Sequence, residues 1–253
     1  VRFSFKGILT MARAKYWVVN TRIPLWLKKP EETTLIQTWH GTPLKKLGVD
    51  IENITMPGVT TQQYHGQVTK DSSKWNKMIS PNRYSTDIFK SAFQIEERQM
   101  INSGYPRNDV LVNESENVSK RKSIISKLDI PTDKKIILYA PTWRDNEFKK
   151  IDHYTTDLKL DLERLKEEFC NDVVILIRAH YLIANELDLS AYDGFAYDVS
   201  NYQDIQELYL VSDMLITDYS SVFFDYAILK RPMIFFAYDL DDYGEAIRGF
   251  YFD

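Results

Sequence analysis

Short, unbroken apolar runs alternate along the chain with longer stretches in which apolar residues recur every three or four positions. Runs without a polar face are typical of strands buried on both sides, and the wider spacing is typical of helices. Strands that alternate with helices predict an α/β fold built on parallel sheets. The expected strands are residues 16–20, 33–39, 77–80, 136–140, 173–177, 195–199, 214–217 and 233–236. The expected helices are residues 3–14, 85–93, 96–102, 158–169 and 205–211, with a further helix that opens at Ser220 and Ser221.

A polar, charged stretch over residues 113–122 interrupts this pattern and marks a candidate boundary between two halves. We therefore predict an N-terminal domain over residues 1–118 and a C-terminal domain over residues 119–253. Residues 50–75 are polar and turn-rich without a clear period, so no regular element is predicted there. Both ends of the chain look cut, the first inside an expected helix and the last directly after an aromatic segment. We expect the chain to be a piece of a longer protein.

The composition is that of a soluble globular protein. The 253 residues are 44% hydrophobic and 27% charged, and the net charge of -4 does not suggest a nucleic-acid partner. The single cysteine, Cys170, excludes an internal disulfide and a cysteine-rich metal site. No apolar run approaches the roughly 20 residues of a membrane-spanning helix, so we expect no span.

Four of the expected strands run directly into polar side chains that carry chemistry. In open parallel sheets, ligands bind beyond the carboxyl ends of the strands. A single histidine after a strand is usually a structural residue, whereas four such ends together favour a site for an anionic ligand. The four segments are His40-Gly41-Thr42, Pro141-Thr142-Trp143-Arg144, Arg178-Ala179-His180 and Asp218-Tyr219-Ser220-Ser221.

These residue types suit phosphoryl transfer, in which catalysis is mostly positioning and neutralisation of charge. Histidine is the natural general base near neutral pH, and the planar fork of arginine pairs with phosphate oxygens. Ser220 and Ser221 would add neutral donors at the positive end of a helix, and Asp225, one turn further on, suits the diol of a ribose. The alternative interpretation of this stretch is a pair of capping serines and a solvated aspartate.

Other classes of site lack their motifs. The chain has no GxxxxGK[ST] loop, no GxGxxG after a strand and no GxSxG elbow, so a P-loop enzyme, a nicotinamide enzyme and a Ser–His–Asp hydrolase are not predicted. No cluster of His, Asp and Glu has the spacing of a metal site, and we expect neither a metal nor a cofactor. His65 and His153 lie in polar, irregular stretches and are expected to be surface residues.

Five segments together resemble the CDP-glycerol glycerophosphotransferase family, which comprises the teichoic acid polymerases and primases of Gram-positive bacteria. They are WHGTPLKKLG (39–48), YAPTWR (139–144), RAH (178–180), TDYSSVFFDY (217–226) and RGFYFD (248–253), in the family's order. The resemblance covers nearly the whole chain. It implies a GT-B-like fold, in which two Rossmann-like domains face each other across a cleft and the C-terminal half holds most of the donor. It also implies that the start of the first half and the closing helices of the second lie outside this chain.

The resemblance implies a role for each matching residue. On the acceptor side, His40 would take the proton from the attacking hydroxyl, and the loop that meets the donor would be shaped by Gly41, Thr42, Pro43 and Leu44. On the donor side, Arg107 would reach the phosphates across the cleft, and His180 would steady the leaving CMP. Pro141 and Thr142 would border the cytidine, Arg178, Ala179 and His180 would bracket the diphosphate, Ser220 and Ser221 would hold phosphate, and Asp225 would hold the ribose.

Each of these roles has a structural alternative. Gly41 and Pro141 are also ordinary turn residues, and Arg107 is also expected as a surface arginine beside Asp109. Asp225 has two nearby basic residues with which it is able to pair, Lys230 and Arg231.

The activity that the resemblance implies is transfer of glycerol phosphate from CDP-glycerol to the terminal hydroxyl of a lipid-linked glycerol phosphate acceptor, with release of CMP. It places the protein peripherally on the cytoplasmic face of the cell membrane, where Lys28, Lys29, Lys45 and Lys46 either meet anionic lipid or form an ordinary solvated surface. Transfer from CDP-ribitol, a nucleotide-sugar GT-B glycosyltransferase and a non-catalytic nucleotide-binding module are the alternatives. The presence of both His40 and His180 argues against the last.

Overall fold

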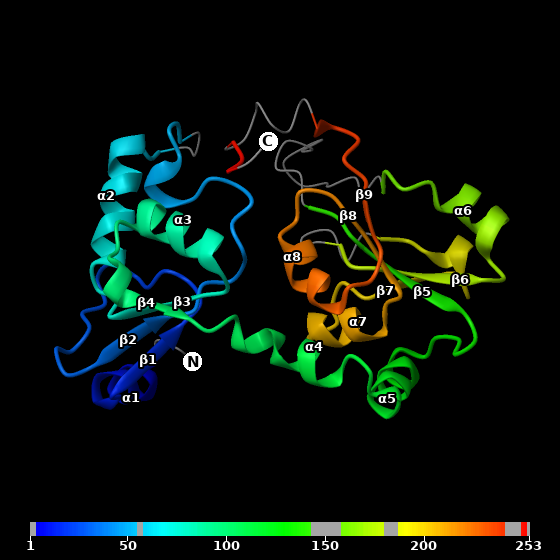
Figure 1. Ribbon diagram of the computed structural model, residues 1–253, viewed down its shortest axis with the longest axis horizontal. Helices are drawn as coiled ribbons and strands as arrows, with labels where there is room; N and C mark the ends of the chain where they lie inside the picture. Colours follow the sequence, from blue (N-terminus) through cyan, green and yellow to red (C-terminus); the bar gives the residue numbers. More distant parts are fainter. Residues whose placement is uncertain (1–3, 55–57, 143–157, 180–186, 241–248, 252–253) are drawn as a thin grey trace. The chain divides into compact units, whose positions relative to one another are not determined.

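The computed structural model describes residues 4–54, 58–142, 158–179, 187–240 and 249–251 (Figure 1). The chain forms two compact units, one from residues 1–106 together with 239–253 and the other from residues 107–238. Each unit contains one parallel sheet with helices packed on it, which confirms the predicted α/β fold with two Rossmann-like halves. None of the helices in the described ranges is long and apolar enough to cross a membrane.

The first unit is built on a four-stranded sheet with the strand order β1-β2-β3-β4, in which all neighbours are parallel. Its strands are β1 (Tyr16–Val19), β2 (Thr34–Gln37), β3 (Lys77–Ser80) and β4 (Met100–Asn102). Its helices are α1 (Phe5–Arg13), α2 (Thr61–Ser72) and α3 (Arg83–Phe93). Its core joins the strands to α3 through buried side chains that include Trp17, Leu35, Met78, Phe89 and Phe93.

The second unit is built on a five-stranded parallel sheet with the order β7-β6-β5-β8-β9. Its strands are β5 (Lys135–Ala140), β6 (Val173–Ile177), β7 (Ala196–Asp198), β8 (Met214–Thr217) and β9 (Met233–Phe235). Its helices are α4 (Asp109–Glu114), α5 (Val118–Leu128), α6 (Leu162–Phe169), α7 (Ile205–Val211) and α8 (Val222–Tyr226).

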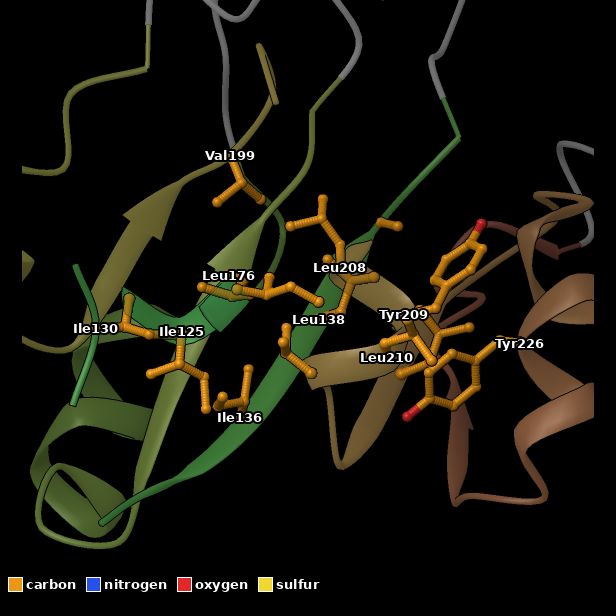
Figure 2. Close-up of a cluster of buried hydrophobic side chains, with 14 of the residues drawn as sticks. Ile125, Ile130, Ile136, Leu138, Leu176, Val199, Leu208, Tyr209, Leu210 and Tyr226 are labelled. Carbon is orange, nitrogen blue, oxygen red and sulfur yellow. The ribbon is translucent and has the colours of Figure 1, made fainter. Parts of the chain in front are cut away.

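The central strands of this second sheet are buried on both faces, because successive side chains of a strand point to opposite sides. Leu138 of β5 and Leu176 of β6 lie in a core cluster with Leu208 and Tyr209 of α7 (Figure 2). The intervening Tyr139 and Ile175 lie in a separate cluster to which α6 contributes Leu162. Burial of both faces is the physical reason why these strands are unbroken apolar runs in the sequence.

All eight expected strands are present close to their predicted positions. The predicted helix over residues 96–102 is wrong, because these residues form a 3-10 turn (Glu97–Gln99) followed by β4, which pairs with β3. Apolar spacing over so short a stretch does not separate a helix from a turn and a strand. The predicted start of a helix at Ser85 is also late, because α3 is capped by Asn82, whose Oδ1 accepts a hydrogen bond from the N–H of Ser85.

Helix α2 lies within residues 50–75, where no element was predicted. It is mostly polar and buries only Val68, Asp71 and Ser72, so it has no apolar stripe to detect. Its sequence signal is the capping box, in which Thr60 and Gln63 each bind the other's backbone N–H through a side-chain oxygen.

The division into compact units differs from the predicted boundary at residue 118. The second unit begins at Arg107, because α4 and α5 contribute Leu111 and Ile124 to its core. Apart from residues 115–117, which connect α4 to α5, the polar residues that suggested a linker belong to these two helices. At the other end, residues 239–253 belong to the first unit, where Phe250 forms an antiparallel bridge with Lys45.

Candidate functional site

The loop that follows β2 begins with a tight reversal at Trp39. This residue has a left-handed backbone (φ 53°), which is uncommon for a bulky side chain, and its N–H donates to the buried side chain of Gln37 at 2.8 Å. The indole packs against Phe93 of α3, with the ring centroids 4.7 Å apart. These contacts hold the strained backbone in place, and the residue that follows, His40, is exposed at the end of β2.

The ring of His40 is fixed in orientation and in tautomer. It stacks on Trp39 with centroids 4.3 Å apart, and its Nδ1 lies 2.7 Å from the carbonyl oxygen of Asn20. Because a carbonyl oxygen only accepts hydrogen bonds, Nδ1 carries the proton and the lone pair of the neutral ring is on Nε2. A lone pair on Nε2 of an exposed histidine whose ring is fixed is what a general base requires.

Two tyrosines hold the backbone of the loop after His40. The hydroxyl of Tyr105 donates to the carbonyl oxygen of Gly41 at 2.8 Å, and that of Tyr84 donates to the carbonyl oxygen of Pro43 at 2.7 Å. Burial raises the pKa of Tyr84 to about 12, so this hydroxyl stays protonated as a donor. Residues 41–43 are buried, so this part of the predicted site shapes the loop through its backbone and does not present side chains to a ligand.

In the second unit, the strand order places several predicted residues at a topological switch point. The chain goes from β5 to β6 and β7 on one side, and then to β8 and β9 on the other. Doubly wound sheets bind ligands in the crevice beside such a point, which here lies at the carboxyl ends of β5 and β8. The residues that follow these two strands are Pro141 and Thr142, and Asp218 to Ser221.

Asp218 belongs to one of the four strand-end segments, but neither the sequence pattern nor the resemblance gave it a role. It is 5% exposed, and its Oδ1 accepts a hydrogen bond from the N–H of Thr142 at 2.8 Å. One residue earlier, the hydroxyl of Thr217 donates to the carbonyl oxygen of Ala140 at 2.7 Å. These two bonds join the ends of β5 and β8 and set the path of the loop that begins at Pro141. The sequence signal was an acidic residue directly after a buried strand.

Ser220 and Ser221 lie where the sequence predicted them, directly before a helix. Ser221 is the N-cap of α8, and its side chain makes no capping hydrogen bond. Both serines are partly exposed, and within the described ranges neither hydroxyl makes a hydrogen bond. The hydroxyls are therefore available to an external acceptor such as a phosphate oxygen.

Asp225 pairs with Arg107, and neither of the anticipated partners, Lys230 and Arg231, forms this ion pair. The guanidinium of Arg107 donates to both carboxylate oxygens at 2.9–3.2 Å, and Nδ2 of Asn108 donates to Oδ1 at 2.7 Å. The side chain of Asp225 is 11% exposed and that of Arg107 is 30% exposed. Within its own unit, Arg107 therefore neutralises Asp225.

Arg231 does not pair with Asp225, because its guanidinium is bound to backbone carbonyl groups elsewhere. Its guanidinium donates to carbonyl oxygens at the end of α7, those of Tyr209, Leu210 and Ser212. These carbonyl groups lie at the C-terminal end of α7, where the next helical turn is missing, so Arg231 serves as a cap for α7.

Arg178 and Ala179 follow β6 as predicted. Nη1 of Arg178 donates to the carbonyl oxygens of Val199 and Tyr202, at 3.3 and 2.7 Å, and burial lowers the pKa of the guanidinium. The other guanidinium nitrogens make no hydrogen bond within the described ranges. The N–H of Ala179 donates to the hydroxyl of Ser200 at 3.0 Å.

Three of the strand-end residues, Trp143, Arg144 and His180, lie outside the described residues, as does His153. His65 lies on α2, where it is partly buried and its Nε2 is 2.8 Å from the carbonyl oxygen of Ile51, so its role is structural. Across the described part of the chain, no group of three or more His, Cys, Asp and Glu side chains has the arrangement of a metal site.

Comparison with known proteins identifies the family of the chain. The model of the family described as CDP-glycerol:poly(glycerophosphate) glycerophosphotransferase matches residues 1–253. A teichoic acid poly(glycerol phosphate) polymerase from Bacillus subtilis strain 168 is 56% identical over 252 residues, which are 100% of this chain and 34% of the relative. A teichoic acid poly(ribitol-phosphate) polymerase from Bacillus spizizenii is 34% identical over 90% of this chain and 35% of its own length.

A solved structure of the wall teichoic acid polymerase TagF with CDPG has a TM-score of 0.93 and 53% sequence identity. The match covers 98% of this chain and 60% of the solved one. The chain therefore spans only part of the proteins that it matches. Because the family model and these relatives cover essentially every residue, the chain belongs to the CDP-glycerol:poly(glycerophosphate) glycerophosphotransferase family.

Proposed function

We propose that the protein transfers glycerol phosphate from CDP-glycerol to the terminal hydroxyl of a poly(glycerol phosphate) acceptor. The acceptor oxygen forms a bond to the β-phosphorus, the bond from that phosphorus to the bridging oxygen breaks, and CMP leaves with the electron pair. The hydroxyl proton passes to Nε2 of His40 and then to solvent. The observation that carries this proposal is the fixed tautomer of His40, an exposed residue, which places the ring's lone pair on Nε2.

The switch point of the second unit supplies groups for the donor. Ser220, Ser221 and the remaining guanidinium nitrogens of Arg178 would bind diphosphate oxygens and stabilise the charge that passes to CMP. Asp225 does not repel this diphosphate strongly, because Arg107 compensates its charge. Pro141, Thr142 and Ala179 border the same edge, and we assign His180 to the leaving group because it directly follows this segment.

Glycerol is the polyol that the relatives favour. The poly(glycerol phosphate) polymerase is 56% identical to this chain and the poly(ribitol-phosphate) polymerase is 34% identical, so transfer from CDP-ribitol is the second candidate. A pocket for ribitol differs mainly in size, and we expect discrimination between the two donors of about tenfold to a few hundredfold.

We propose that the first 30 residues of the chain meet the anionic face of a membrane. They contain no Asp or Glu, although the whole chain has a net charge of -4. Phe5 of α1 is 86% exposed and Trp26 is 62% exposed, beside basic residues. Exposed apolar side chains among cations are typical of surfaces that bind anionic lipid. The basic residues are Arg2, Lys6, Arg13, Lys15, Arg22, Lys28 and Lys29.

The full-length protein tests the reaction directly. We would follow CMP release with a short glycerol phosphate primer and either CDP-glycerol or CDP-ribitol, and compare the His40→Ala variant. His65→Gln is the matched control, because His65 is a structural histidine of the same unit. We expect release with CDP-glycerol, at least a hundredfold loss in His40→Ala and no more than a twofold change in His65→Gln.

Other outcomes would change the proposal. Release with CDP-ribitol alone keeps the mechanism and replaces the substrate. Release with neither donor, while cytidine nucleotides still bind, overturns the transferase proposal. For the membrane surface, sedimentation with phosphatidylglycerol vesicles should exceed sedimentation with phosphatidylcholine vesicles, and a Phe5→Ser/Trp26→Ser variant should lose most of the difference. Equal sedimentation by variant and parent would refute this assignment.

A further inference from the structure

The loop that carries His40 has no regular secondary structure, so its position depends on side chains from elsewhere. Tyr84 and Tyr105 hold its first half, as described above. Its second half is held by a segment about 200 residues further along the chain, Gly249–Tyr251, which belongs to the same compact unit. This segment is part of the RGFYFD motif, which has no role in the proposed reaction or in the proposed donor site.

The backbone of this segment pairs with the loop as a short antiparallel ladder. The N–H of Lys46 donates to the carbonyl oxygen of Gly249 at 3.0 Å, and the N–H of Tyr251 donates to the carbonyl oxygen of Leu44 at 3.0 Å. Leu44 is the last of the four residues that are expected to shape the loop facing the donor. Two bonds between distant parts of the chain fix the course of this loop where it leaves the site.

The hydroxyl of Tyr251 then joins three elements. It accepts a hydrogen bond from the N–H of Leu47 at 3.0 Å and donates to Oδ2 of Asp50 at 2.7 Å. Oδ1 of Asp50 in turn accepts a hydrogen bond from the hydroxyl of Ser91 on α3 at 2.6 Å. Burial and the neighbouring carboxylate of Asp50 raise the pKa of Tyr251, so its hydroxyl remains a donor. The loop is thereby connected to α3, against which Trp39 also packs through Phe93.

We propose that Tyr251 is a positioning residue for the His40 loop, and this inference rests on the proposed transferase function. Trp39 and Phe93 attach one end of the loop to α3, and the bonds of Tyr251 attach the other end. With both ends held, His40 stays at a constant distance from an acceptor bound to this unit. A displacement of about 1 Å at such a residue costs up to about a hundredfold in rate, so the hydroxyl of Tyr251 matters to turnover without contact to substrate.

The test compares Tyr251→Phe with Tyr64→Phe in the full-length protein. Tyr251→Phe keeps the ring and removes only the hydroxyl. Tyr64, on α2 of the same unit, is the control, because its hydroxyl makes no hydrogen bond within the described residues. For Tyr251→Phe we expect kcat to fall about tenfold while KM for CDP-glycerol changes less than twofold. We also expect faster amide hydrogen exchange at Leu47, whereas Tyr64→Phe should match the parent in kcat, KM and exchange.

The outcomes separate this inference from the proposed function. If the parent releases CMP, and Tyr251→Phe matches it in kcat and in exchange at Leu47, the positioning role is refuted. A variant in which kcat and KM change by similar factors and the melting temperature also falls would refute the role too, because this combination indicates general destabilisation. If the parent releases no CMP from either donor, the transferase proposal fails, whereas exchange at Leu47 still tests whether Tyr251 holds the loop.

Discussion

The ion pair between Arg107 and Asp225 gives the sharpest prediction about the second unit. Three hydrogen bonds join the two groups, at 3.1, 2.9 and 3.2 Å, and Asn108 adds a fourth hydrogen bond to the carboxylate. Removal of one partner from a buried pair costs about 3–5 kcal/mol, because the other charge is left without compensation. Arg107 is 30% exposed, so we expect the low end of this range, about 3 kcal/mol, for Arg107→Met.

The assay is a double-mutant cycle in urea with Arg107→Met, Asp225→Asn and the combined variant. Asp225→Asn should cost about 2 kcal/mol and the combined variant about 3 kcal/mol, because the second change removes the stranded charge. The coupling is therefore about 2 kcal/mol. Arg107→Met alone should lower the melting temperature by about 10 °C.

A matched pair on the surface provides the control. Arg83 and Asp87 on α3 are also joined at 3.1 Å, but their side chains are 78% and 54% exposed. Their coupling should not exceed about 0.5 kcal/mol. If the coupling of Arg107 and Asp225 is equally small, the pair does not stabilise the unit and both residues are again candidates for contact with the donor.

Two further predictions concern a carboxylate and a glycine away from the site. Hydrogen bonds, of which that from Lys120 has the largest effect, lower the pKa of Glu207 from its ordinary 4.5 to about 2. The stability that Glu207 contributes is therefore complete above pH 4.5 and is lost as the pH falls toward 2. Glu207→Gln should cost about 1–2 kcal/mol at pH 7 and flatten the acid limb of a stability–pH curve, and an unchanged limb would contradict this assignment. Gly48→Ala should cost more than about 2 kcal/mol by urea denaturation, because φ is +50° and a Cβ would lie 2.0 Å from the carbonyl oxygen of Ala92. Gly66→Ala, in the open interior of α2, should instead stabilise by about 0.5–1 kcal/mol, and similar values for the two glycines would refute the steric argument.

The strands and the edge at which the candidate residues gather were predictable from the sequence, and for the same reason. A strand buried on both faces must be apolar throughout, so β5, β6 and β8 stand out from their surroundings. Parallel strands bring their carboxyl ends to one edge, which predicts that Thr142, Arg178 and Ser220 lie along it. Polar helices such as α2 lack this signal, because few of their side chains enter the core.

Side-chain pairing between distant segments was not predictable. Arg107 and Asp225 are 118 residues apart, and the sequence offered nearer partners for each, Asp109 for the arginine and Arg231 for the aspartate. The choice is made by packing, because α4 and α8 belong to one core in which Leu111 and Tyr226 are both buried. The same limit applies to His40, whose tautomer depends on a carbonyl oxygen 20 residues earlier.

This pairing changes where the positive charge for a diphosphate must come from. An arginine that already makes a two-pronged contact with a carboxylate does not offer its fork to phosphate without leaving an 11% exposed aspartate unpaired. Among the described residues Arg178 has no such partner, since its Nη1 donates only to neutral carbonyl oxygens. We therefore expect Arg178→Met to weaken binding of CDP-glycerol about tenfold or more in isothermal titration, with a smaller effect for Arg107→Met at a temperature at which both variants are folded. The opposite order would show that Arg107 exchanges Asp225 for the donor.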